Sequence, residues 1–108
     1  MTLDATNTPR YPVVLFPEGY EERLEDEAPE RGYLSHVIVA TPDGLRYRLF
    51  FIDLTRLSQD LPRDVGSGRA YFAEPGLIVV PEVTRAAIEH AVRGLWEELF
   101  FEDLQPLS

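Results

Sequence analysis

The sequence predicts an α+β domain in which a single antiparallel sheet of four to five strands carries two helices packed on one face. Two tight-turn signals between short apolar segments predict antiparallel pairing, and an amphipathic pattern near the C-terminus predicts a helix. The predicted order of elements is β-β-β-α-β-β-α within one domain over residues 11–108. Residues 1–10 mix Thr, Asn, Asp and Pro without hydrophobic periodicity, so we expect a flexible tail there.

Three strands are predicted in the first half of the chain. Residues 11–17 (YPVVLFP) are apolar and β-branched, and Pro12 favours a position at the sheet edge because proline cannot donate to a neighbouring strand. Residues 34–40 and 45–52 flank the sequence TPDG at 41–44, which is typical of a type I turn followed by a left-handed glycine. These two segments therefore predict a hairpin.

The third strand of this set shows which of its faces is buried. Its apolar residues alternate with Arg46 and Arg48, so one face is expected to contact the core and the other to face solvent. The apolar side of that alternation consists of Leu45, Tyr47, Leu49 and Phe51.

A short helix and a second hairpin are predicted next. Asp53 or Thr55 can cap a helix that reaches about residue 61 and ends at Pro62, and residues 63–69 are expected to form a flexible connection. Two short apolar segments, 70–74 and 77–80, then flank a Pro-Gly pair. Because proline and glycine suit the two central positions of a type II turn, the sequence predicts a second antiparallel hairpin.

The last predicted element is an amphipathic helix that begins after Thr84. Thr84 is a suitable N-cap, and Val83 before it can pack on Ile88 as a hydrophobic staple. One stripe of the helix is expected to be buried: Ile88, Val92, Leu95 and Leu99. Beside it lies a ladder of alternating charge, expected to face solvent: Arg85, Glu89, Arg93 and Glu97.

The composition excludes several classes of protein. The net charge is -9, and all ten basic residues are arginine, so binding to nucleic acid or to an anionic membrane is not expected. The chain has no cysteine, which excludes disulfides and thiolate chemistry, and no apolar run approaches the length of a membrane span. The N-terminus shows no secretory signal. We therefore expect a cytoplasmic protein without a cofactor.

Few residues suggest catalysis. The only histidines are His36, expected to be half-buried in a strand, and His90, expected to face solvent on the last helix. The sequence GSG at 66–68 precedes a predicted strand, not a helix, and the chain has no lysine, so a phosphate-binding loop is not expected. A pair of carboxylates acting as acid and base stays open, because sequence does not show which acids meet in space.

Residues 18–30, hereafter the acidic segment, hold the densest charge, with seven carboxylates in thirteen residues. A calcium loop is not expected, because no glycine interrupts the segment to form the required tight turn. A marginal helix and a solvated loop both fit, since Tyr20, Leu24 and Ala28 form only a thin apolar stripe and several like charges are four residues apart. As a docking surface it would use Glu21, Glu22, Glu25, Asp26, Glu27 and Glu30.

These observations lead to three hypotheses about function. The first is a small acidic, non-catalytic protein that docks onto a basic protein partner, like an immunity or antitoxin inhibitor. The second is a homo-oligomeric module, for example a homodimer, with exposed aromatic residues such as Phe50, Tyr71 or Trp96 at the contact. The third is a small carboxylate-based enzyme or ligand-binding domain, which would be favoured by a pocket with two carboxylates near His36. The acidic segment could also simply keep the protein soluble.

Overall fold

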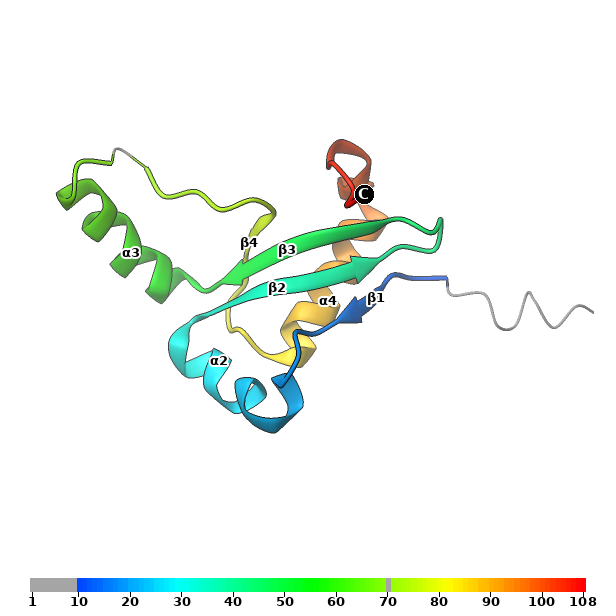
Figure 1. Ribbon diagram of the computed structural model, residues 1–108, viewed down its shortest axis with the longest axis horizontal. Helices are drawn as coiled ribbons and strands as arrows, with labels where there is room; N and C mark the ends of the chain where they lie inside the picture. The colour runs from blue at the N-terminus through cyan, green and yellow to red at the C-terminus, as the bar shows by residue number, and fades with distance from the viewer. Residues whose placement is uncertain (1–9, 70) are drawn as a thin grey trace, which may run out of the picture.

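A computed structural model describes residues 10–69 and 71–108 (Figure 1). The protein is of the α+β class, and its four strands form one sheet in the order β1-β2-β3-β4. The pairs β1–β2 and β2–β3 are antiparallel, but β4 runs parallel to β3. The sheet is therefore mixed, and the prediction of a wholly antiparallel sheet is wrong. The strands are β1 (Val13–Leu15), β2 (Tyr33–Ala40), β3 (Arg46–Ile52) and β4 (Leu77–Val79).

The described chain contains three α-helices, where the sequence predicts two. A π-helical turn, η1, leads directly into the first of them, and a 3-10 turn, η2, follows the last. None of these helices is both long enough and apolar enough to cross a membrane. Except for Arg10, the predicted flexible tail lies outside the described residues. The helical elements are η1 (Tyr20–Leu24), α2 (Glu25–Arg31), α3 (Leu54–Gly66), α4 (Arg85–Glu97) and η2 (Phe100–Asp103).

The central hairpin of β2 and β3 has the predicted turn. Gly44 has φ of 88°, in the left-handed region that favours glycine, and its N–H donates to the Thr41 carbonyl at 3.0 Å. Burial alternates along β3 as predicted, with Arg46 and Arg48 exposed and Tyr47, Leu49 and Phe51 buried. Leu45, predicted on the buried side, lies just before the strand and is 40% exposed. The turn chemistry and the alternation are both local properties, which is why the sequence alone predicts them.

A β-bulge in β2 changes the position of one histidine. Ser35 and His36 together lie opposite the single residue Phe50 of β3, and His36 has φ of 62°. The extra residue restores the alternation, so that Leu34 and Val37, three positions apart, both face the core. His36 is consequently exposed. The expectation that His36 is half-buried is wrong, because the residues around it predict an uninterrupted strand and the bulge has no signal in the sequence.

The segment after β3 forms a β-α-β unit instead of a second hairpin. Parallel neighbours need a long crossover, and α3 lies within the crossover from β3 to β4. Residues 71–74 form no strand, and residue 70 lies outside the described residues. A turn does exist at Pro75–Gly76, but it presses the backbone against β3: the Phe50 N–H donates to the Gly76 carbonyl at 3.0 Å. The Pro-Gly pair thus positions β4 and does not join two antiparallel strands.

Helix α3 is longer than predicted and projects from one end of the sheet (Figure 1). It continues through Pro62, and no residue in it is buried. A proline removes one intrahelical hydrogen bond, and on an exposed helix the carbonyl that loses its partner can bond to water. The radius of gyration is 15.7 Å, compared with about 13 Å expected for a compact domain of this length. Because α3 runs to Gly66, the predicted helix end at Pro62 is wrong, and residues 63–66 of the predicted flexible connection belong to the helix.

The core lies between the sheet and the other helical elements, on one face only. In Figure 1, α4 passes behind β2 and β3. The side chains that meet there come from all parts of the chain: Tyr20, Ala28, Val37, Val39, Leu49, Phe51, Val83, Ile88, Val92 and Phe101. The opposite face of the sheet has no helix of this core against it. Helices on one face were predicted, and this holds for α4 and for η1 with α2 but not for α3.

Candidate functional site

The acidic segment is helical, which decides between the two forms that the sequence leaves open. Gly19 reverses the chain with φ of 80°, η1 and α2 follow without a break, and Gly32 ends α2 with φ of 82°. Tyr20 and Ala28 are buried in the core. A thin apolar stripe is marginal for an isolated helix, but tertiary packing supplies most of the stability of a helix in a protein.

Arg85, the first residue of α4, holds the acidic segment against the body. Its Nε donates to Glu25 Oε2 at 2.9 Å and its Nη2 to Glu25 Oε1 at 3.2 Å, and the same Nη2 lies 3.6 Å from Glu21 Oε1. The guanidinium carbon also lies 4.8 Å from the ring centroid of Phe16 and 5.2 Å from that of Tyr20. Two-point pairing with a carboxylate and contact with aromatic faces are interactions that arginine makes well.

Three ionisation equilibria are shifted around Arg85. The hydrogen bond from Arg85 lowers the pKa of Glu25, and the same bond raises the pKa of the Arg85 guanidinium. Burial raises the pKa of the Tyr20 hydroxyl, and the nearby charge of Glu25 adds to this effect. Because the folded pKa of Glu25 is depressed, the pair stabilises the fold above the ordinary glutamate pKa and loses that effect as the pH falls through the lowered value.

The predicted docking residues divide into two groups. Glu21 and Glu25 are paired with Arg85, and Glu27 Oε1 lies 3.4 Å from the Nε of Arg23. The other three residues are exposed and spaced by four, so they follow one side of the helical segment: Glu22, Asp26 and Glu30. No residue that the structure describes forms an ion pair with these three. We call them the outward row.

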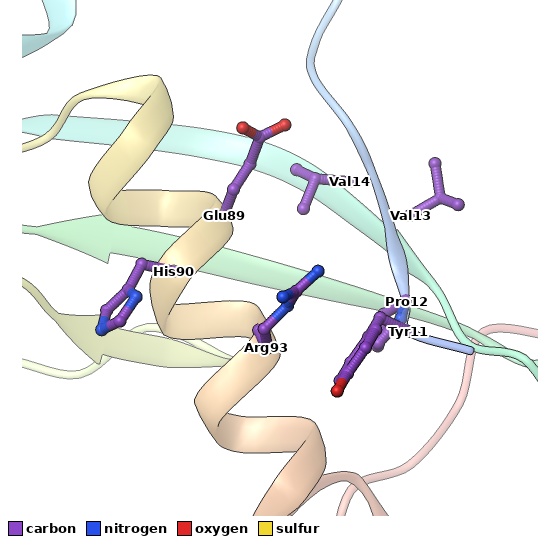
Figure 2. Close-up of a pocket in the computed structure, with 7 residues that line it drawn as sticks. All are labelled: Tyr11, Pro12, Val13, Val14, Glu89, His90 and Arg93. Atoms are coloured by element: carbon purple, nitrogen blue, oxygen red, sulfur yellow. The ribbon is translucent and has the colours of Figure 1, made fainter. Parts of the chain in front are cut away.

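The predicted charge ladder on α4 is not formed. Arg85 pairs with the acidic segment, and Arg93 lies over the ring of Tyr11, with 4.0 Å from the guanidinium carbon to the ring centroid. Within the described chain, none of the four ladder residues pairs with another. Glu89, His90 and Arg93 belong to the lining of a cleft of about 440 Å³ between α4 and the segment around β1 (Figure 2). His90 is exposed, as the helical periodicity predicts.

The surroundings of His36 bear on the hypothesis of an enzyme. A cleft of about 460 Å³ is lined by Ser35, His36 and Glu74, and the Nδ1 of His36 lies 3.0 Å from the Ser35 hydroxyl. Glu74 is the only carboxylate residue among those lining this cleft, whereas a pocket with two would favour that hypothesis. Across residues 10–69 and 71–108, no three histidine or acidic side chains are grouped so that they could hold a metal ion.

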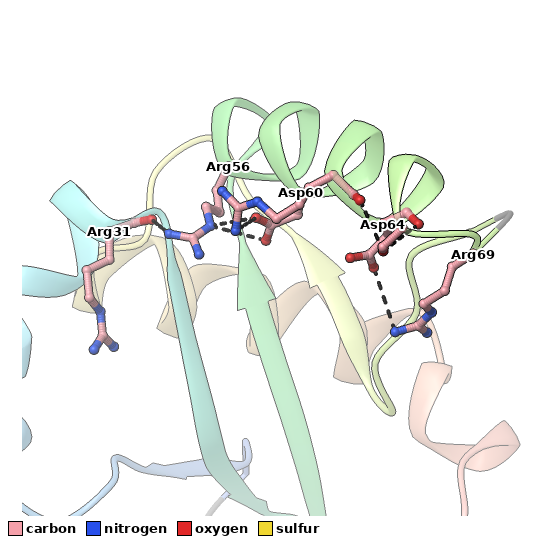
Figure 3. A network of polar contacts seen from close by, with 7 residues as sticks. Arg31, Arg56, Asp60, Asp64 and Arg69 are labelled. Carbon is pink, nitrogen blue, oxygen red and sulfur yellow. Dashed lines mark hydrogen bonds and ion pairs between the residues drawn. The ribbon is translucent and has the colours of Figure 1, made fainter.

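A polar network joins α3 to the end of α2 (Figure 3). The Nε of Arg56 donates to both carboxylate oxygens of Asp60, at 3.0 and 3.1 Å, and its Nη1 donates to the Arg31 carbonyl at 3.2 Å. Farther along the helix, Arg69 Nη1 lies 3.8 Å from Asp64 Oδ2. The network orients the projecting helix and leaves its apolar residues Leu54, Leu61 and Val65 exposed.

A second acidic surface lies at the C-terminal end of α4. There η2 and the following residues form a groove of about 440 Å³ over the start of β3, hereafter the C-terminal groove. Two carboxylates, Asp43 and Glu102, line it, and its apolar lining is Leu45, Tyr47, Trp96, Leu99, Phe101, Leu104 and Pro106. Burial, followed by the charge of Asp43, raises the pKa of the Tyr47 hydroxyl. The sequence pattern assigned Leu99 to the buried stripe of α4, which is wrong, because α4 ends at Glu97 and Leu99 is 61% exposed.

Comparison with known proteins supplied no further guide: no family model, no curated protein and no solved structure matched the chain.

Proposed function

We propose that this chain is a cytoplasmic, non-catalytic binding protein whose acidic segment docks onto a basic protein partner, in the manner of an immunity or antitoxin inhibitor. The observation that supports this proposal is the outward row. Three carboxylates, Glu22, Asp26 and Glu30, face solvent from an ordered helical segment, and no described residue pairs with them.

The way the segment is anchored favours a binding role over a role in solubility. Arg85 pairs with Glu25 and lies near Glu21, and buried Tyr20 fixes the start of the segment. The outward row is therefore held in position before any partner arrives, which reduces the entropy lost on binding. The net charge of -9 adds long-range attraction for a basic surface, which salt screens over about 8 Å at physiological ionic strength.

Neutralising the outward row is expected to slow association with the partner. The variant Glu22→Gln/Asp26→Asn/Glu30→Gln should reduce kon by about tenfold at low salt and flatten its dependence on salt, because it removes the charges nearest the basic surface. The fold should persist, since like charges four residues apart repel one another. The partner is first identified as the protein that wild-type bait retains from its native cells. Its association rate is then measured against salt concentration.

A matched control separates a local effect from an effect of net charge. The variant Glu74→Gln/Glu82→Gln/Glu89→Gln removes the same number of charges from exposed positions outside the acidic segment. It should bind the partner nearly as fast as wild type. Equal slowing by both variants would contradict docking at the acidic segment, and so would unchanged rates for both.

A second candidate function, self-association, is favoured by the uncovered face of the sheet. Val13, Leu15 and Val79 are 46%, 36% and 50% exposed, on the edge strands β1 and β4. Leu15 lies beside Ile38 in the sheet register, and β3 contributes Phe50 to the same face. Arg48, which lies opposite Ile38, also belongs to this face. Exposed apolar side chains on a sheet face can form a contact between proteins.

If the uncovered face joins two copies, the sedimentation-derived mass of the wild-type protein should rise toward that of a dimer with increasing concentration. The variant Leu15→Glu/Val79→Glu should remain monomeric over the same range, because it would bury two charges without partners. A wild-type protein that is monomeric at every concentration would rule out this second function.

A further inference from the structure

The C-terminal groove lies at the opposite end of α4 from the acidic segment (Figure 1). Two stretches that are far apart in sequence form it. One is the turn after β2 with the start of β3, and the other is the end of α4 with η2 and the residues after it. Phe101 is buried, and its ring centroid lies 5.1 Å from that of Tyr47, so the floor of the groove belongs to the core. Its volume of about 440 Å³ is within the range of roughly 300–1,000 Å³ that is common for binding clefts.

Leu99 occupies a backbone position that is unfavourable for leucine. It lies between α4 and η2 with φ of 62° and ψ of 25°, and its N–H donates to the Trp96 carbonyl at 3.1 Å. Glycine is the usual residue at such a left-handed helix end, because a β-carbon is strained there. The Leu99 side chain is 61% exposed, so burial in the protein's own core does little to offset the strain. Strain combined with an exposed apolar side chain points to a contact outside the chain.

The charges around the groove indicate what kind of partner fits. Asp43 and Glu102 line it, and the chain from 97 to 103 reads EELFFED, with four acidic residues and no basic one. An apolar floor with an acidic rim is complementary to a segment that has apolar side chains on one side and basic side chains beside them.

We infer that the C-terminal groove binds a basic amphipathic segment of another protein. Its apolar side chains would cover Leu99 and Trp96, and its basic side chains would pair with Glu102 and Asp43. This site is separate from the outward row and goes beyond the proposed function. A partner that reaches both ends of α4 could occupy the two surfaces together.

The test uses Trp96, the only tryptophan of the chain, as a reporter. Trp96 lines the groove and is half-buried, so a segment bound there should change its emission. The full-length protein is titrated with a designed amphipathic helical peptide of leucine and lysine, and separately with the same design in leucine and glutamate. We expect a saturable blue shift with the lysine peptide and none with the glutamate peptide.

Variants then locate the binding. Leu99→Gly should weaken binding of the lysine peptide by about tenfold or more without lowering the denaturation midpoint, because it removes the apolar contact and relieves the strained backbone. Glu102→Gln should weaken binding and reduce its dependence on salt. Leu54→Ala removes a leucine of similar exposure (67%) from α3 and should leave affinity unchanged.

Several results would overturn the inference. The first two are no emission change with either peptide and equal binding of both peptides. The third is an unchanged affinity of Leu99→Gly for the lysine peptide. The fourth is a lowered denaturation midpoint for that variant, which would show that Leu99 packs within the fold. An emission shift that depends on protein concentration alone would assign the groove to a second copy. The outward-row variant should still bind the lysine peptide, so failure of one site is distinguishable from failure of the other.

Discussion

Replacing Phe51 with alanine is expected to lower the free energy of unfolding by about 3 to 5 kcal/mol, because it removes a fully buried aromatic side chain and leaves a cavity. Phe51 is 0% exposed and lies in β3, opposite Leu34 of β2 and Ile78 of β4. Its side chain therefore contacts the part of the core where the antiparallel and parallel pairings meet. Urea denaturation monitored by circular dichroism gives the difference, with the slope of the transition as a check on two-state behaviour.

The neighbouring residue gives the control for this prediction. Phe50 is half-buried on the uncovered face, where its ring stacks on Tyr33 at 5.9 Å between centroids. Because less of Phe50 is removed from water, Phe50→Ala should cost clearly less than Phe51→Ala. If Phe50→Ala proves the more destabilising of the two, the faces of the sheet have been assigned the wrong way round.

Replacing Gly76 with alanine is expected to destabilise the protein by about 2 to 5 kcal/mol, as the sum of a strained left-handed backbone and overpacking. Gly76 has φ of 70°, and a β-carbon there would lie 2.4 Å from the carbonyl oxygen of Arg48 and 3.1 Å from the Cα of Leu49. Both of these atoms belong to the backbone of β3, so they cannot rotate away as a side chain could. Denaturant titration measures the loss.

Gly44 separates the two contributions to that cost. Its φ of 88° is also left-handed, but a β-carbon there would have no neighbour within 4 Å. Gly44→Ala should therefore cost only the conformational part, about 1 to 2 kcal/mol. Equal losses for the two variants would show that Gly76 is not pressed against β3, and would remove the basis for the parallel β3–β4 pairing.

Local chemistry accounts for what the sequence predicts well. The side chain of Asp53 accepts a hydrogen bond from the Arg56 N–H at 2.8 Å, and that of Thr84 accepts one from the Ala87 N–H at 3.1 Å, as expected of helix N-caps. The turn at Gly44 and the alternation along β3 belong to the same class. Each depends on residues within about four positions of one another, so the chain encodes it without reference to the rest of the fold.

The candidate sites depend on contacts that have no local signature. Sequence placed the carboxylates in one segment, but only packing of that segment on α4 pairs Glu25 with Arg85, sixty positions away, and leaves Glu22, Asp26 and Glu30 outward. The C-terminal groove could not be predicted at all, because its walls come from segments far apart in the chain. An exposed leucine with positive φ is visible only once the backbone is known.

The sequence by itself determined the α+β class, the central hairpin and the N-cap at Thr84, and it narrowed the other N-cap to Asp53 or Thr55, since turn preference, capping and hydrophobic period act over a few residues. Tertiary structure alone decided the direction of β4. A Pro-Gly turn is compatible with a hairpin, but here Gly76 lies so close to Arg48 and Leu49 that β4 continues parallel to β3 after the α3 crossover. Tertiary packing likewise ordered the acidic segment, because burial of Tyr20 and Ala28 outweighs the repulsion among its carboxylates.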